Sequence, residues 1–199
     1  MKRRFAVAVG LAAMVAALAA PSAVGGEDNG TGNTAVTYGV TMNTPNGAKA
    51  PSGDRVRVQC TFGLGGCGTF TTKDKAVNMS GTFVHTDSAG NVVGSGTWVA
   101  TQLISYAAYG CGVVDFDGPG GSPPVTIPPF ICGGALKLSV LLTAGTQQFE
   151  GILTIFCIVG ENPPNSHDEL AEEGVTLNIP GVINFNQVDF TGTNNFVQL

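Results

Sequence analysis

The residues best suited to acid–base catalysis in this chain are a histidine and an aspartate two positions apart. His85 ends a run in which apolar and polar residues alternate, and Asp87 lies in the turn that follows. A carboxylate that orients an imidazole is a common arrangement for a general base. One hypothesis is therefore a secreted hydrolase or isomerase whose site, inside a barrel, uses His85 and Asp87. The simpler interpretation is a half-buried histidine at a strand end beside a turn aspartate.

A second pair of acids has the spacing with which calcium-binding loops begin. Asp115 and Asp117 are followed directly by Gly118, and calcium prefers carboxylate and carbonyl oxygens. The chain then continues through prolines and glycines without the further acidic ligands of a complete loop. A calcium-stabilised adhesive module using these two aspartates is thus another alternative, and no other cofactor is expected.

Five cysteines indicate two disulfides and one free thiol in an oxidising compartment. Cys111 and Cys132 flank a Gly- and Pro-rich stretch, and a bridge between them closes a loop of about 20 residues, worth roughly 3 kcal/mol. We expect this pair to form. The second bridge stays open, because Cys60 can pair with Cys67 across a tight turn or with Cys157 in the core. No two cysteines have the C-x-x-C spacing typical of zinc sites.

Aromatic residues gather around the stretch between Cys111 and Cys132. Tyr109 precedes this stretch, and Phe116 and Phe130 lie within it. Exposed aromatic rings offer sugars and other ligands an apolar surface. We therefore predict a ligand rim of Tyr109, Phe116 and Phe130, for a small molecule, a glycan or a cell-surface ligand. The alternative is that these rings belong to the core.

Motifs and charge exclude several classes of function. The chain has no G-x-S-x-G, H-E-x-x-H, Walker or dinucleotide-binding motif. Beyond the first 19 residues it carries six bases and fourteen acids, a net charge of −8, and nothing basic follows Lys137. A phosphate-binding surface requires clustered Lys and Arg. Nucleic acid and anionic membrane surfaces are therefore not expected as partners.

The first residues have the three parts of a secretory signal peptide. A basic start is followed by an apolar run over residues 5–20 and by small residues, and we place cleavage after Ala19. The run of 16 residues is shorter than the ~20 that span a bilayer. We expect residues 1–19 to be removed, residues 20–34 to be a flexible lead-in, and residues 35–199 to form one domain outside the cytoplasm.

Strand-length runs of alternating apolar and polar residues recur along that domain, with turn residues between them. This period of two predicts half-buried strands. We count about nine, mostly joined as hairpins, which indicates an all-β fold: an antiparallel up-and-down barrel or a β-sandwich. After Trp98 the apolar phase slips, which predicts a β-bulge near Ala100–Gln102. A capping box at Ser166 and Glu169 predicts one short helix near 167–173.

Two stretches resemble small secreted bacterial proteins of unassigned function. They are Gly81 to Asp87 with Gly94 to Thr101, and Cys157 to Gly160 with Pro163-Pro164 and Glu172 to Leu177. The resemblance covers roughly residues 40–190, implies a compact β-domain and adds no site. We expect the mature chain to be a secreted, non-enzymatic binding or structural domain.

Overall fold

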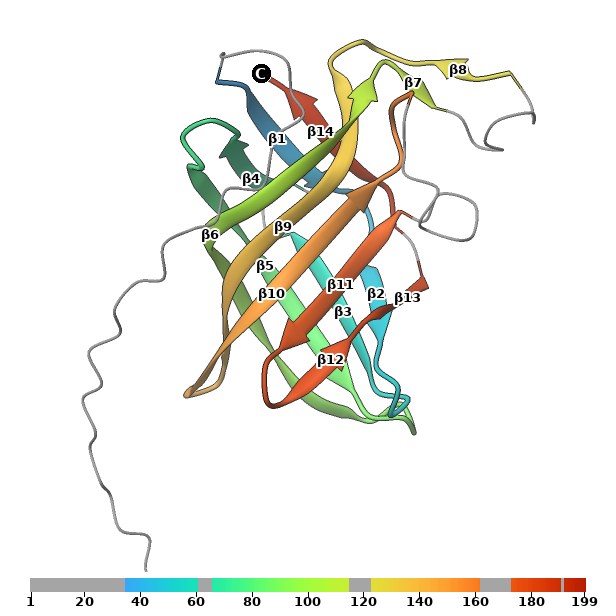
Figure 1. The fold of residues 1–199 in the computed structure, drawn as a ribbon. Coiled ribbons are helices and arrows are strands. Elements are labelled where there is room, and N and C mark those ends of the chain that lie inside the picture. The colour runs from blue at the N-terminus through green and yellow to red at the C-terminus, as the bar shows by residue number, and fades with distance from the viewer. Residues whose placement is uncertain (1–34, 61–65, 115–122, 162–172, 191) are drawn as a thin grey trace, which may run out of the picture.

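A computed structural model gives the fold of this chain (Figure 1). The predicted signal peptide, the predicted lead-in and the loop residues Asp115, Phe116 and Asp117 lie outside the described part of the chain. The helix predicted near 167–173 also lies outside it, except for Glu173, which is in a coil just before a strand. The structure describes residues 35–60, 66–114, 123–161, 173–190 and 192–199.

The described residues form strands and their connections, without a helix. Fourteen strands lie in these ranges, rather than the nine expected, mainly because short strands also form at Asn46–Lys49, Gly66–Thr71, Val113–Val114 and Val125–Thr126. Their bounds are β1 (Thr37–Met42), β2 (Asn46–Lys49), β3 (Arg55–Cys60), β4 (Gly66–Thr71), β5 (Val77–Thr86), β6 (Val92–Cys111), β7 (Val113–Val114), β8 (Val125–Thr126), β9 (Ile131–Ala144), β10 (Gln147–Cys157), β11 (Gly174–Ile179), β12 (Ile183–Phe185), β13 (Gln187–Phe190) and β14 (Asn194–Gln198).

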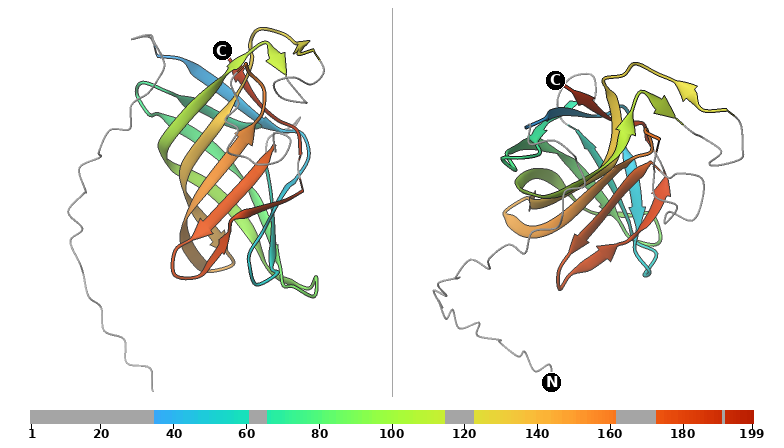
Figure 2. Two further views of the ribbon diagram at one scale, coloured as in Figure 1. Left: turned by 45° about the vertical axis from the view of Figure 1, so that its right-hand side comes forward. Right: turned by 45° about the horizontal axis from the view of Figure 1, so that its top comes forward.

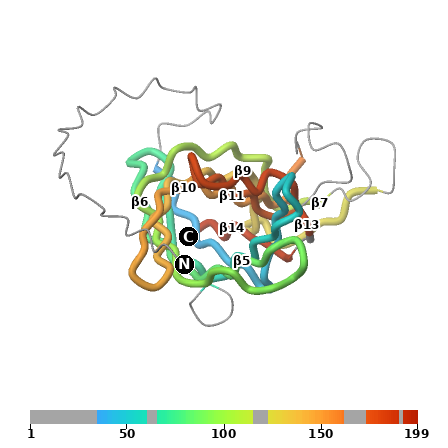
Figure 3. The backbone as a smooth tube through the Cα atoms, turned by 90° about the horizontal axis from the view of Figure 1, so that it is seen from below, coloured from blue at the N-terminus to red at the C-terminus, as the bar shows by residue number. Residues whose placement is uncertain are grey.

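Six strands close into an antiparallel barrel. Around the ring the order is β1, β4, β5, β6, β9 and β14, and β14 pairs with β1 to complete it. The ring therefore follows the order of the chain. Seen from below, the backbone winds around a common interior (Figure 3). The all-β barrel predicted from the sequence is confirmed, and the sandwich alternative is not adopted.

Two excursions extend this ring. β2 and β3 are inserted between β1 and β4, and β3 pairs with β5. β10 to β13 are inserted between β9 and β14, and β10 pairs with β9. The excursions meet because β13 pairs with β2 while β12 pairs with β11. β12 ends at Phe185 and β13 begins at Gln187, so Asn186 alone carries the chain from one sheet edge to the other.

The alternation of apolar and polar residues in the sequence places apolar side chains on the buried face of the sheet and polar side chains on its exposed face. In β3, Val56 and Val58 are buried while Arg55 and Arg57 are exposed, because successive side chains of a strand point to opposite faces. The pairing of β6 with β9 shifts register between Ala100 and Gln102, which confirms the predicted bulge, and it shifts twice more further along β6.

We call the end of the barrel that carries β7 and β8 the upper end, and the opposite end the lower end (Figure 1). Four aromatic rings pack together in the upper half, with centroids 4.8 to 6.0 Å apart. They belong to Tyr38, Phe70, Tyr106 and Phe196, and the Tyr106 hydroxyl donates to the carbonyl of Gly133 at 3.0 Å. The rings fill the upper half of the barrel with apolar side chains.

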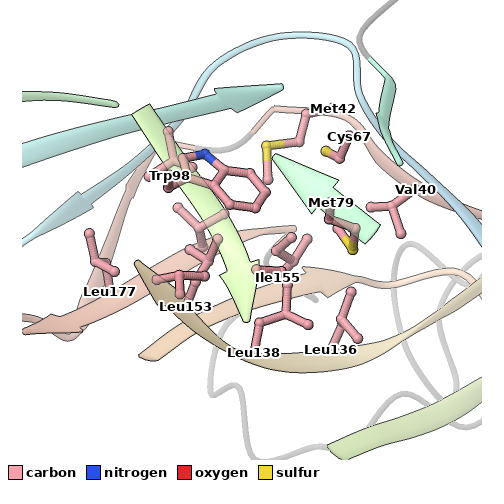
Figure 4. Close-up of a cluster of buried hydrophobic side chains, with 14 of the residues drawn as sticks. Val40, Met42, Cys67, Met79, Trp98, Leu136, Leu138, Leu153, Ile155 and Leu177 are labelled. Carbon is pink, nitrogen blue, oxygen red and sulfur yellow. The ribbon is translucent and has the colours of Figure 1, made fainter. Parts of the chain in front are cut away.

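The lower half is filled around Trp98, which is 1% exposed. Trp98 lies directly opposite Gly81 in the β5–β6 ladder, and a Cβ at Gly81 would lie 2.6 Å from Cε2 of the indole. The ring therefore packs against bare backbone, with Met42, Leu153 and other buried side chains around it (Figure 4). No space for a water molecule remains among the side chains that line this region, namely Val58, Phe83, Trp98, Val140, Leu142, Leu153 and Leu177.

Candidate functional site

His85 lies near the lower end of the barrel, close to the end of β5. Its Nε2 is 3.2 Å from Oδ2 of Asp54, and both side chains are 25% exposed. Asp54 comes within reach because Val56, two residues further along, pairs directly with His85. The imidazole also meets the ring of Phe185 edge-on, with centroids 5.2 Å apart.

Asp87, the residue predicted to orient His85, instead organises its own turn. Its Oδ1 accepts hydrogen bonds from the backbone N–H groups of Ala89 and Asn91, at 3.0 and 2.8 Å. Its Oδ2 accepts one from the Asn91 side-chain amide at 3.0 Å. The hydrogen bond from the Asn91 side chain lowers the pKa of Asp87 most, and the one from the Asn91 backbone N–H lowers it further. The carboxylate partner of His85 is therefore Asp54, and Asp87 belongs to the β5–β6 turn.

The His85–Asp54 pair has the parts of a general base, but the interior beside it is packed. Along β5, His85 has the same orientation as Phe83, and Phe83 lines the region without room for water. Phe185, 1% exposed, covers one edge of the imidazole. A substrate would therefore have to reach His85 from the exterior of the barrel.

Metal binding finds no support in the described part of the chain. No group of three or more His, Cys, Asp or Glu side chains there is arranged to hold a metal ion. The two aspartates with calcium-loop spacing, Asp115 and Asp117, lie outside the described residues, so a calcium site at these positions stays a prediction.

The five cysteines form two disulfides and leave one thiol. Cys111 and Cys132 face each other across β6 and β9 and are bonded, as the sequence predicts. Cys60 is bonded to Cys67, one of its two predicted partners. Cys157, the other predicted partner, is free and buried in the core.

A buried polar cluster, which we call the polar seam, lies where β2 and β14 approach β10 and β11. It consists of Asn46, Asn194, Glu173 and Cys157. The two asparagines are fully buried, and the Asn46 amide donates to Oδ1 of Asn194 at 2.9 Å. The Asn194 amide donates to the carbonyl of Phe156 at 2.9 Å. Through Asn194 of β14, these bonds join β2 to β10, two strands that do not pair with each other.

Glu173 and Cys157 complete the polar seam. Oε2 of Glu173 accepts from the backbone N–H of Asn194 at 3.0 Å, and Oε1 is 3.9 Å from the Cys157 sulfur. Burial raises the pKa of both groups, to about 12 for the thiol. A cysteine nucleophile must ionise to its thiolate. Cys157 therefore stays protonated at neutral pH, and the seam is built to hold strands together.

An apolar segment projects from the upper end (Figure 2). We call its residues, Pro123–Phe130, the proline arm. Every residue of the arm is exposed except Ile127, which is half-buried. Val125 is 48% and Phe130 is 52% exposed. The arm carries no charged side chain, and the next one along the chain is Lys137. Contiguous exposed apolar surface of this kind marks interaction sites.

The base of the arm is fixed by backbone hydrogen bonds beside the Cys111–Cys132 disulfide. The N–H of Gly112 donates to the carbonyl of Ile131, and the N–H of Ile127 donates to the carbonyl of Gly112, both at 2.9 Å. The short strands β7 and β8 pair beyond this point. The arm is therefore held to the barrel at a defined angle.

Of the three residues predicted to form a ligand rim, Tyr109, Phe116 and Phe130, only Phe130 is an exposed residue of the described chain. Phe130 is exposed on the proline arm, Phe116 lies outside the described residues, and Tyr109 is only 6% exposed. Gly160 packs closely against the Tyr109 backbone, where a Cβ at position 160 would overlap the Tyr109 carbonyl. Tyr109 therefore does not belong to an exposed surface, and its burial raises the pKa of its phenol.

Sequence reasoning missed the partners that lie far apart in the chain. Asp54 and His85 meet through strand pairing, and Asn46 and Asn194 are 148 residues apart. The sequence does contain a signal that could have predicted the proline arm, namely two Pro-Pro pairs, at 123–124 and 128–129, in a stretch without charge.

Among the described residues, no helix is both long enough and apolar enough to cross a membrane. Comparison with known proteins found no matching family model, no matching curated protein and no matching solved structure.

Proposed function

We propose that this protein is a secreted, non-enzymatic binding domain that engages its partner with the outside of the barrel. The observation that carries the proposal is the contrast between a packed interior and the exposed proline arm. A protein that carries a ligand inside a barrel needs a cavity, commonly of about 300 Å³ or more. The region around Trp98 has no room even for water.

Two further features support a role outside the cell. The first residues have the pattern of a signal peptide, and the structure holds two disulfides, which persist in oxidising compartments. The negative charge of the domain favours solubility. A rigid, disulfide-linked barrel with one projecting apolar segment suits binding at a surface.

The test is saturable binding of the purified, labelled protein to the surface of the cells that produce it. The proposal predicts a specific, displaceable signal with wild-type protein. Binding that rises linearly with concentration, without displacement by unlabelled protein, would contradict it. A matched pair of variants locates the site: Phe130→Ser on the proline arm and Val182→Ser on a lower-end turn, where Val182 is 63% exposed.

A second candidate function is acid–base catalysis, because His85 and Asp54 are in contact at 3.2 Å. This candidate requires that any hydrolase or isomerase activity of the purified protein depend on both residues. His85→Ala and Asp54→Asn should then abolish turnover at unchanged melting temperature, while Asp87→Asn should leave turnover intact. Turnover that survives His85→Ala excludes the candidate.

A further inference from the structure

Three strands have an end in the polar seam. β10 ends at Cys157, β11 begins at Gly174 and β14 begins at Asn194. The ladder between β10 and β11 closes with Phe156 opposite Gly174, and β10 does not pair with β14. The ends of elements are among the parts of a fold that open most easily. The contacts that join these three ends therefore decide whether this junction stays closed.

One asparagine joins the three strand ends. The side-chain amide of Asn194 donates to the carbonyl of Phe156 at 2.9 Å and to that of Gly174 at 3.2 Å. It therefore reaches the end of β10 and the start of β11 from β14. The backbone N–H of Asn194 donates to Oε2 of Glu173 at 3.0 Å. Glu173 directly precedes β11, so its carboxyl group fastens the start of that strand to β14.

The junction compensates an ionised Glu173 poorly. A carboxylate has room for about four hydrogen bonds. The carboxyl group of Glu173 receives one from the Asn194 N–H, and its other oxygen is 3.9 Å from the Cys157 sulfur. No base is among the groups of the described chain that act on its pKa, and burial raises that pKa above its usual value. Ionisation therefore weakens the closed junction.

The other titratable groups of the described chain around the junction keep their protons at neutral pH. From β10, the Cys157 thiol faces Glu173, and burial raises the pKa of that thiol to about 12. From β6, Tyr106 and Tyr109 interact with the thiol, and burial raises the pKa of both phenols. Asn194 from β14 does not titrate. Glu173 is therefore the group whose charge changes between acidic and neutral pH.

Glu173 also covers the thiol on its solvent side. Cys157 is 0% exposed. Of the residues that the structure places at its sulfur, Cys132, Val159 and Phe196 are buried, whereas Glu173 is half-buried. A movement of Glu173 into water would therefore uncover the sulfur.

We propose that Glu173 is a proton-dependent latch: with its carboxyl group protonated the ends of β10, β11 and β14 stay joined, and with it ionised they open locally and expose Cys157. Opening lets water hydrate the carboxylate, which offsets the hydrogen bonds that are lost. The latch is closed at acidic pH and loosens as the pH rises through the raised pKa of Glu173. This device goes beyond the proposed binding function and requires no partner.

The thiol itself reports the opening in the full chain. Cys157 is the free cysteine of the structure. Its thiolate attacks dithiodipyridine: a bond forms between its sulfur and one sulfur of the reagent, the disulfide of the reagent breaks, and the released thiopyridone is measured by absorbance. Rates are recorded from pH 4.5, the usual pKa of a glutamate, upward for wild type, Glu173→Gln and Glu161→Gln. Glu161 is exposed just after β10 and provides the matched control.

The ratio of the wild-type rate to a variant's rate isolates the opening, because the thiolate fraction rises with pH in every protein. The ratio of wild type to Glu173→Gln should rise several-fold above pH 4.5 and then become constant once Glu173 is ionised. The ratio of wild type to Glu161→Gln should stay constant. Low concentrations of urea should change the rates little, since a local opening exposes little surface.

Two outcomes of this experiment would overturn the latch. One is a ratio of wild type to Glu173→Gln that does not change with pH. The other is a rate that rises with urea as steeply as global unfolding does, because the thiol would then react only from the unfolded chain.

A measurement on wild type alone decides the question if Glu173→Gln does not fold. The N–H of Asn194 donates to Glu173, so its chemical shifts in NMR spectra should titrate with a midpoint above pH 4.5. The reactivity of Cys157, divided by that of the urea-unfolded chain at the same pH, should rise with the same midpoint. Shifts that do not titrate, or two midpoints that differ, would refute the inference.

Discussion

The barrel interior and the proline arm are both built from uncharged residues, but the fold places them in opposite environments. Trp98 in the lower barrel is 1% exposed, whereas Phe130 on the arm is 52% exposed. Burial of apolar area stabilises a fold by roughly 25 cal/mol per Å², so the interior contributes to stability. The exposed part of the arm contributes none, and its apolar area is available to a partner. Substitutions in the two regions should therefore separate stability from binding.

The largest effect is expected at Trp98. Trp98→Ala removes the largest buried ring and leaves a cavity, which should lower the free energy of unfolding by about 3–5 kcal/mol. Its Nε1 has no hydrogen-bond partner among the described residues, and an unsatisfied buried donor costs about 1–3 kcal/mol. Trp98→Phe removes that donor while it keeps a ring, so its loss should be clearly smaller. Denaturant unfolding of both variants checks this; equal losses would contradict a packed interior.

The two disulfides should differ in their contribution. Cys111–Cys132 closes a loop with a sequence separation of 21 and Cys60–Cys67 one of 7. In the chain-entropy model these loops are worth about 3 and about 2 kcal/mol. The double variant Cys111→Ser/Cys132→Ser should therefore unfold more readily than Cys60→Ser/Cys67→Ser. It should also weaken partner binding, because the first bridge anchors the proline arm. Binding unchanged by loss of that bridge would mean that the arm needs no anchor.

The polar seam should be sensitive to loss of an amide. Asn194→Leu removes the donor to Phe156 and the partner of Asn46, and each buried group left unsatisfied costs about 1–3 kcal/mol. Thermal unfolding should show a loss in that range. Asn195→Leu is the control, because Asn195 is only half-buried and its side chain is 3.5 Å from the Thr41 hydroxyl. Equal losses for the two variants would refute the structural role of the seam.

A smaller, pH-dependent effect is expected at Glu173. Burial raises its pKa above the usual 4.5, so the folded state holds the proton more tightly than the unfolded chain. The stability contributed by this group is then complete below pH 4.5 and is lost as the pH rises through the raised value. Glu173→Gln should remove that loss, so that the variant gains stability relative to wild type as the pH rises above 4.5. If the unfolding free energies of wild type and Glu173→Gln change in parallel with pH, Glu173 is not desolvated.

The smallest effect on stability is expected on the arm. Phe130→Ser and Val125→Ser expose no core surface, so their melting temperatures should match that of wild type within about 1 °C, since exposed substitutions stay within about 0.5 kcal/mol. Differential scanning calorimetry checks this. A large drop in melting temperature would show that the arm packs on the barrel and belongs to the stabilising region.

Local pattern was enough to predict the fold class but not the contacts across it. The alternation of apolar and polar residues predicted strands, and the phase slip after Trp98 predicted the bulge near Ala100–Gln102. The ring order and the meeting of the two excursions depend on pairings such as that of β13 with β2, which no local pattern encodes.

The candidate site shows the same limit. Sequence proximity suggested Asp87 for His85, but the strand ladder brings Asp54 instead. Its position beside the loop suggested that Tyr109 belongs to the rim, yet Tyr109 is only 6% exposed, and its backbone packs against the distant residue Gly160. Phe130 was found because its exposure follows from its immediate Pro-rich surroundings.

The most direct test of a sealed interior and an outward-facing binding surface is the fluorescence of Trp98, the only tryptophan in the chain. The folded protein should emit at short wavelength, resist quenching by iodide, and transfer no excitation to added parinaric acid, an apolar chain that a hollow barrel would take up. The emission should also stay unchanged when a partner binds the proline arm. Saturable energy transfer from Trp98 to parinaric acid would show that the barrel holds a ligand inside and would contradict the account.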